Sequence, residues 1–159
     1  GDHAFENNVG IATIFLPDTV KEIGDSAFYG CTGLTAADLG DGVTTINEDA
    51  FRNTGLIQIK LSKNLNSLDD CVFMNCTNLL SINLPASVTK VGDRVFRGCT
   101  GLTKVQLPQK LTALGYELFS KCTNLCGINL PTSITKIHAL AFASCTSLTE
   151  IQLPQKGSV

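Results

Sequence analysis

The 159-residue chain has no tryptophan, and charged residues make up only 16% of it, against about a quarter in a typical soluble domain. Its 12 Lys and Arg residues nearly balance its 14 Asp and Glu residues, and the basic ones are scattered along the chain. Because nucleic-acid binding depends on clustered basic residues, this pattern argues against a nucleic-acid partner. The apolar content of 43% and the low net charge also exclude a disordered chain.

Long apolar runs are missing too. No segment approaches the roughly 18–20 residues that a membrane-spanning helix needs, so direct membrane insertion is not expected. Residues 1–5 contain no basic region followed by an apolar stretch, so we expect no signal peptide within the given sequence, which does not indicate a compartment. The only histidines are His3 and His138, and there is no Cys-x-x-Cys motif. We therefore expect no zinc or other metal site and no cofactor.

The chain does contain a repeat of about 23 residues. Seven of its eight phenylalanines recur at intervals of 22 or 23 residues. They are Phe5, Phe28, Phe51, Phe73, Phe96, Phe119 and Phe142. All five prolines follow a leucine at one position of the repeat, and five of the seven cysteines lie three residues after one of these phenylalanines. Because phenylalanine, proline and cysteine recur at fixed positions relative to one another, the sequence indicates a repeat architecture.

One repeat has the pattern of a short strand followed by turns. In residues 81–84, apolar Ile82 and Leu84 alternate with two polar residues, which is typical of a strand with one face directed inward. Pro85 ends this strand, because proline has no amide hydrogen to donate to a ladder. Residues 95–98 are too few for a helix, so we expect a turn or a 3₁₀ segment there.

One such coil cannot bury its own apolar edge, but stacked coils can, because each strand pairs with the same strand of the next coil. The sequence therefore predicts a repeat solenoid that is mostly β. A parallel sheet of short strands forms one face, turns or 3₁₀ segments form the other, and there are no long helices. We expect residues 1–159 to form a single solenoid of about seven coils.

Both ends of the chain interrupt the repeat, so we expect it to be a fragment of a longer array. Its terminal coils would then expose apolar edges, which allow end-to-end self-association.

The same repeat also resembles a known family of repeat proteins. The L-x-x-I-x-L core resembles the leucine-rich repeat, and Leu84-Pro85 with the segments 88–93 and 95–102 resembles its BspA-like subclass, over residues 4–154. The resemblance implies a non-enzymatic protein-binding or adhesion module of a cell-surface or secreted protein. Its implied partner is a host matrix or cell-surface protein, or another cell. The alternatives are a structural spacer in a larger surface protein and, more remotely, an enzyme.

The outward positions of the first strand are the candidate partner-binding surface, because packing does not dictate them. The candidate residues are Thr13, Phe15, Asp38, Gln58, Lys60, Ser81, Asn83, Lys104, Gln106, Asn129, Glu150 and Gln152. The alternative is a solvated face that keeps the rod soluble. Phe15 is the one phenylalanine outside the repeated position, and it is either a contact anchor or a residue covered by a preceding coil.

The sequence shows no set of residues arranged for catalysis. A cysteine nucleophile needs a nearby histidine base, and we expect His138 on an exposed turn away from the repeated cysteines. The repeated cysteines are expected to be unpaired thiols that fill a core position, although neighbouring coils would be close enough for disulfides. The turn 51–56 lacks one residue, which we assign to the cysteine position. Other departures also cluster early, so we expect the array from Cys76 onward to be better packed.

Overall fold

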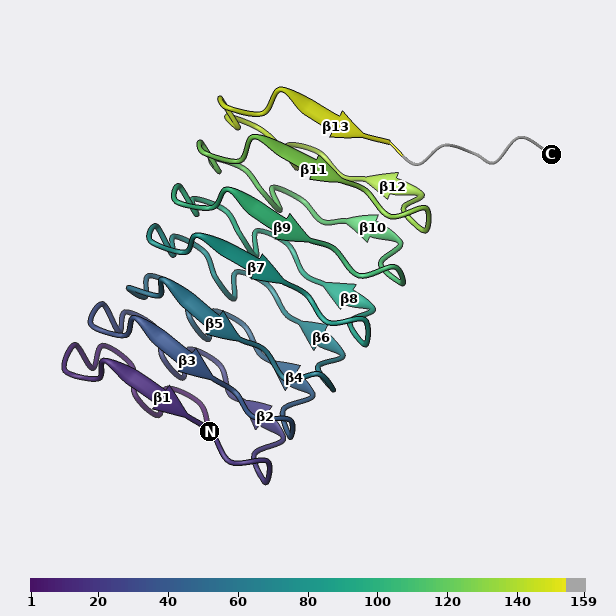
Figure 1. Ribbon diagram of the computed structural model, residues 1–159. Coiled ribbons are helices and arrows are strands. Elements are labelled where there is room, and N and C mark those ends of the chain that lie inside the picture. The colour runs from purple at the N-terminus through teal and green to yellow at the C-terminus, as the bar shows by residue number, and fades with distance from the viewer. Residues whose placement is uncertain (154–159) are drawn as a thin grey trace.

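The computed structural model describes residues 1–153, which wind into about six turns of a parallel β-solenoid without any helix (Figure 1). The predicted fold is thus confirmed. Pro154 and the remaining residues 155–159 of the predicted domain lie outside the described residues. Residues 1–153 accordingly contain no helix of the length and apolar character needed to cross a bilayer.

The first ladder of the solenoid consists of three-residue strands, one in each coil, that pair in parallel. These strands are β1 (Thr13–Phe15), β3 (Ala36–Asp38), β5 (Gln58–Lys60), β7 (Ser81–Asn83), β9 (Lys104–Gln106), β11 (Gly127–Asn129) and β13 (Glu150–Gln152). Backbone pairing joins β1-β3-β5, β7-β9 and β11-β13, and Figure 1 shows all seven strands in one row. The middle residue of each strand from β1 to β11 lies in the core or packs against it, as the alternating sequence predicts, whereas Ile151 of β13 is 38% exposed.

A second ladder of two-residue strands runs along another side of the coils. It consists of β2 (Glu22–Ile23), β4 (Thr45–Ile46), β6 (Ser67–Leu68), β8 (Lys90–Val91), β10 (Ala113–Leu114) and β12 (Lys136–Ile137), paired as β2-β4-β6-β8 and β10-β12. The sequence predicts turns here, because the apolar residues that mark these strands are isolated rather than alternating. The strands form because identical positions of neighbouring coils meet in register. The segments around the phenylalanines are turns, and no 3₁₀ helix is assigned among residues 1–153.

The proline position explains how each first strand ends. The carbonyl oxygen of Pro85 accepts the backbone N–H of Val88 at 3.0 Å, and the carbonyls of Pro17, Pro108 and Pro131 accept equivalent bonds. Proline therefore opens a turn in which its missing N–H is not needed.

The repeated phenylalanines form a continuous stack through the core. Neighbouring ring centroids lie 5.1–5.8 Å apart, and the ring planes are within 13° of parallel. The four central rings are completely buried, whereas Phe5 is 45% exposed and Phe142 is partly buried. Exposed apolar side chains occur at both ends of the array, as Val9 (66%) and Ile137 (45%) show, so the better packing expected from Cys76 onward stays a prediction. Burial follows the presence of a coil on both sides rather than the regularity of the repeat.

The repeated cysteines are free thiols held by backbone acceptors. The thiols of Cys99 and Cys122 each donate to the carbonyl of a phenylalanine 26 residues earlier, at 3.0 Å. The turn at residues 51–56 is one residue shorter than the others, and the sequence-based assignment of its missing residue to the cysteine position was wrong. Thr54 is 3% exposed and occupies the cysteine position itself, with its Oγ1 3.2 Å from the Sγ of Cys76. The missing residue is therefore the exposed one that follows.

Candidate partner-binding surface

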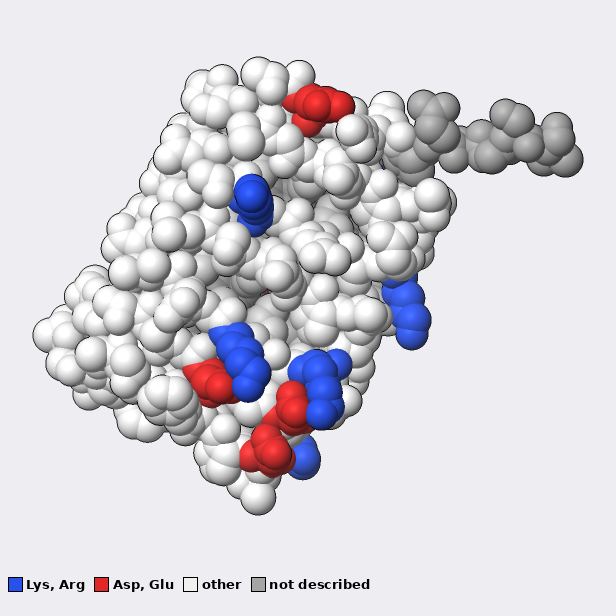
Figure 2. Space-filling view, in the orientation of Figure 1, with Lys and Arg blue, Asp and Glu red and all other residues white. Residues whose placement is uncertain are grey.

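The outer positions of the first ladder form one continuous face of the molecule, which we call the strand face. Each coil contributes two outward positions to it, the first and the last residue of its three-residue strand. Figure 2 shows that acidic and basic side chains gather in one cluster in the lower part of this view and that single charged residues lie elsewhere, so most of this side is uncharged. A partner would meet mainly amide, hydroxyl and apolar groups there.

The structure places all twelve predicted residues on the strand face. Eleven of them are exposed, and Asp38 is half-buried. The side chains of Asp38 and Lys60 come together from neighbouring strands in an ion pair of 3.0 Å. The pKa of Asp38 is lowered, first by the backbone N–H of Gly40 and then by Lys60, and the pKa of Lys60 is raised by Asp38. This pair is therefore charged across the physiological pH range.

The N-terminal part of the strand face holds an exposed aromatic ring. Phe15 is 78% exposed, and no described residue covers it. Beside it lies a hollow of about 320 Å³ whose floor includes the small residues Ala36 and Ala37. A large ring next to a shallow apolar floor is the kind of feature that anchors a protein contact.

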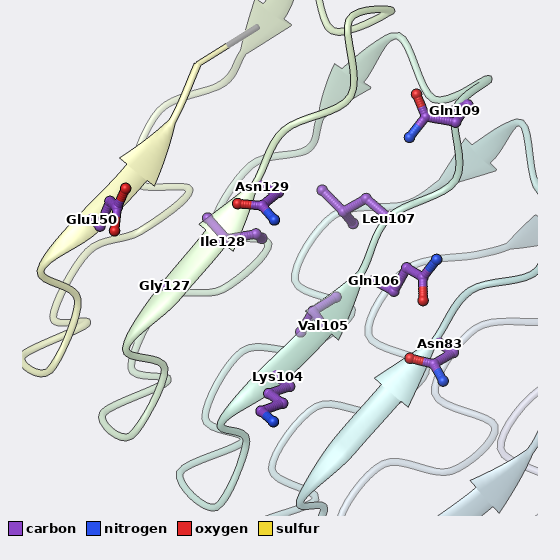
Figure 3. Close-up of a pocket in the computed structure, with 10 residues that line it drawn as sticks. All are labelled: Asn83, Lys104, Val105, Gln106, Leu107, Gln109, Gly127, Ile128, Asn129 and Glu150. Atoms are coloured by element: carbon purple, nitrogen blue, oxygen red, sulfur yellow. The ribbon is translucent and has the colours of Figure 1, made fainter.

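A larger hollow of about 500 Å³ lies over β7, β9, β11 and β13. Figure 3 shows the amides of Asn83, Gln106 and Asn129 on three successive strands, with Lys104 and Glu150 on either side of Gly127. Gly127 creates this depression, because an added Cβ would meet only the carbonyl of Glu150, at 3.8 Å. The hollow thus combines hydrogen-bonding amides with one charge of each sign.

Sequence reasoning did not include the two residues of this hollow that lie outside the strands of the first ladder, Leu107 and Gln109. Both lie at the end of β9 or in the turn after Pro108, outside the alternating segment that defined the candidates. Their constant distance from the proline position is the signal that would have indicated them.

The residues considered for chemistry stay apart. His138 is exposed, as predicted, and within residues 1–153 the hydrogen-bonded thiols bond to backbone carbonyls or to Thr54 rather than to its side chain. Cys126 is exposed, whereas Cys71 is buried. No group of three or more His, Cys, Asp and Glu side chains within residues 1–153 is arranged to hold a metal ion.

The repeat, the two ladders and the thiol pattern agree with a family assignment. The model of the BspA type leucine-rich repeat region, in six copies, matches residues 1–97 and 72–158. The chain belongs to this family. Its known members are non-catalytic leucine-rich repeat modules of bacterial surface-type proteins, and such repeats generally mediate protein–protein interaction. No curated protein matches the chain.

Solved structures support the same fold. A leucine-rich repeat protein from Bacteroides ovatus is 32% identical with a TM-score of 0.88, covering 97% of this chain and 40% of its own. A T. pallidum leucine-rich repeat protein is 27% identical with a TM-score of 0.68, covering 86% of this chain and 78% of its own. The pneumococcal vaccine antigen PcpA is 23% identical with a TM-score of 0.79, covering 92% and 41%. The chain thus spans less than half the length of the Bacteroides ovatus protein.

Proposed function

We propose that this BspA-type array is a non-enzymatic binding module of a cell-surface or secreted protein, and that it contacts a protein partner through the strand face. The observation that carries the proposal is the contour of this face. Among the twelve side chains that packing does not require, Phe15 forms an exposed aromatic knob at one end and five others line a hollow at the other. Such variation on a regular scaffold is what recognition uses.

The surface location follows from the family resemblance, since members of this subclass are mostly surface or secreted proteins. A host matrix protein, a host cell-surface protein or a neighbouring cell is the corresponding partner. The non-enzymatic character is supported by the separation of His138 from every described thiol, because an activated nucleophile needs a base within hydrogen-bonding distance.

Beads coated with the complete chain test the proposal. They are offered to immobilised fibronectin, laminin and collagen and to cultured epithelial cells, and retention is measured under flow. Gln106→Arg with Asn129→Arg fills the hollow with bulky charge and should abolish any retention that the parent chain shows. The matched control, Thr89→Arg, places the same side chain at an exposed position beside the second ladder and should change nothing.

Two results would contradict the proposal. Retention that survives the double substitution would place binding elsewhere on the molecule. A chain that binds none of the matrix proteins or cells would favour the structural spacer instead.

A further inference from the structure

One interface between neighbouring coils lacks the strand pairing that joins the others. Within residues 1–153, β8 is not paired with β10 and β9 is not paired with β11, whereas every other two neighbouring coils share at least one ladder. Both ladders are therefore interrupted at the same place, between residues 88–107 and residues 111–130. We call this interface the seam.

The backbone donors beside the strands show the same interruption. At the interface before the seam, four such N–H groups donate to carbonyls of the neighbouring coil at 2.9–3.0 Å, and they belong to Leu84, Thr89, Gly92 and Thr103. The equivalent N–H groups at the seam, each 23 residues later, donate to no backbone carbonyl among residues 1–153, and they belong to Leu107, Thr112, Gly115 and Cys126. The two coils are thus held less firmly at the seam, because few backbone hydrogen bonds join them.

A change of residue type at Cys126 coincides with the seam. The hydroxyl of Thr103 donates to the carbonyl of Leu80 at 3.1 Å, and the hydroxyl of Thr149 donates to the carbonyl of Cys126 at 3.3 Å. Cys126 occupies the same position of its own coil, and its Sγ lies 3.9 Å from the carbonyl oxygen of Thr103. Since a thiol is a weak donor, the side-chain bond that joins other coils is weakened here.

A second change lies at Lys110, in the turn where the chain crosses the seam. Ser87 and Ser133 hold this position in the adjacent coils, and their hydroxyls donate to the carbonyls of Leu65 and Leu111 at 2.6 and 2.5 Å. Lys110 is exposed and has no hydroxyl. The equivalent side-chain bond to the preceding coil is therefore missing at the seam.

The turns around the phenylalanines still join the two coils. The N–H of Phe96 donates to the carbonyl of Leu118 at 3.0 Å, and the ring of Phe96 stacks on that of Phe119 with centroids 5.5 Å apart. The Nε of Arg94 also donates to Glu117 at 2.8 Å. The seam is thus bonded along the phenylalanine turns and unbonded along both ladders, which is the arrangement of a hinge.

The unpaired strands β9 and β11 lie beneath the larger hollow of the strand face. Figure 3 shows Gln106 on β9 and Asn129 on β11, so that these two amides stand on opposite sides of the seam. The width of the hollow therefore depends on how far the seam is open.

We propose that the seam is a hinge between two rigid blocks, residues 1–107 and residues 111–153. The blocks rotate about the phenylalanine turns on the microsecond-to-millisecond timescale of hinge motions, and the replacement of two hydroxyl side chains by Cys126 and Lys110 frees them to do so. Opening separates Gln106 from Asn129 and widens the hollow, so a partner that contacts both amides holds the seam closed. This last consequence rests on the proposed function, whereas the hinge itself does not.

Amide hydrogen exchange of the complete ¹⁵N-labelled chain, followed by nuclear magnetic resonance, tests the hinge. The four N–H groups at the seam are compared with their equivalents 23 residues earlier, after correction for intrinsic exchange rates. We expect the mean protection at the seam to be lower by about tenfold or more, because local opening requires less free energy where backbone bonds are few. A smaller difference would overturn the proposal.

Relaxation dispersion of the same sample separates a moving hinge from a fixed gap. We expect dispersion at Val105 and Ile128, which face each other across the seam, and flat profiles at Ala37, which lies where both ladders are paired. Flat profiles at Val105 and Ile128 would overturn the proposal, and so would equal dispersion at all three residues.

The double variant Lys110→Ser with Cys126→Thr supplies the two missing hydroxyls. It should abolish the dispersion at the seam and raise the protection of the neighbouring amides by about threefold or more, and an unchanged seam would contradict the proposal. The matched control, Ser133→Lys with Thr149→Cys, makes the reverse changes one coil later and should leave the seam as mobile as in the parent chain. All of these measurements use the free chain, so their outcome is independent of whether coated beads are retained.

Discussion

Replacing Phe96 with alanine removes a ring from the middle of the phenylalanine stack. Phe96 is completely buried, and its centroid lies 5.8 Å from that of Phe73 and 5.5 Å from that of Phe119. Losing the burial of such a side chain costs about 1.5–3 kcal/mol. The coils on both sides are held by backbone hydrogen bonds, so they cannot close the gap, and the residual cavity raises the cost to roughly 3–5 kcal/mol.

Urea unfolding followed by far-ultraviolet circular dichroism measures this loss, because the free energy of unfolding falls linearly with denaturant. Phe5→Ala is the matched control. Phe5 is 45% exposed and stacks on one neighbour only, so its replacement should cost no more than about 1–1.5 kcal/mol. A loss under about 1 kcal/mol for Phe96→Ala would refute the stacked core, since it is below the range for any well-packed phenylalanine.

Because several thiols are buried, we expect the free energy of unfolding to fall at alkaline pH. Burial raises the pKa of Cys76 to about 11 and that of Cys122 to about 12, so the unfolded chain loses these protons first. Stability should be intact below about pH 9 and should fall above it by roughly 1.4 kcal/mol per pH unit for each such thiol. Urea unfolding at pH 7–10.5 checks this, and a pH-independent midpoint would contradict it. Alanine substitution of two glycines, Gly42 in a turn and Gly127 on the strand face, tests how closely each site is packed. A Cβ at Gly42 would lie 2.0 Å from the backbone carbonyl of Asp18, whereas one at Gly127 has its nearest contact at 3.8 Å. Gly42→Ala should therefore destabilise the chain by roughly 1–3 kcal/mol, while Gly127→Ala should stay within about 0.5 kcal/mol of the parent chain. Equal losses in thermal unfolding would show that the two sites are not distinguished by packing.

The sequence predicted the solenoid and its first ladder because these depend on strict repetition. Ile82 and its equivalents recur in phase, and each needs only the next coil to become buried. The second ladder escaped prediction, because two residues such as Lys90 and Val91 carry no alternation of their own and become a strand only through their neighbours. Thr54 was misassigned for a different reason. It lies three residues after Phe51, as the repeated cysteines do after their phenylalanines, but its residue type matches the threonine that follows the cysteine in other coils, so the gap was placed one position too early.

The sequence predicted which residues of the candidate site face outward, but it did not predict where the surface is hollowed. Alternation within each strand identified which side chains point outward, as with Asn83 and Gln106. The hollows depend instead on what neighbouring coils lack, such as the side chain of Gly127, and on turn residues such as Gln109.

Because each coil bonds only to the coils beside it, the stack responds to tension in a particular way. A force applied between the two ends of the array loads the hydrogen bonds between coils in series, so the weakest terminal coil opens first and the others follow one at a time. Each released coil of 23 residues replaces about 5 Å of rod with roughly 75–80 Å of extended chain. An array loaded in this way would lengthen stepwise, while the coils that remain folded keep their surfaces intact.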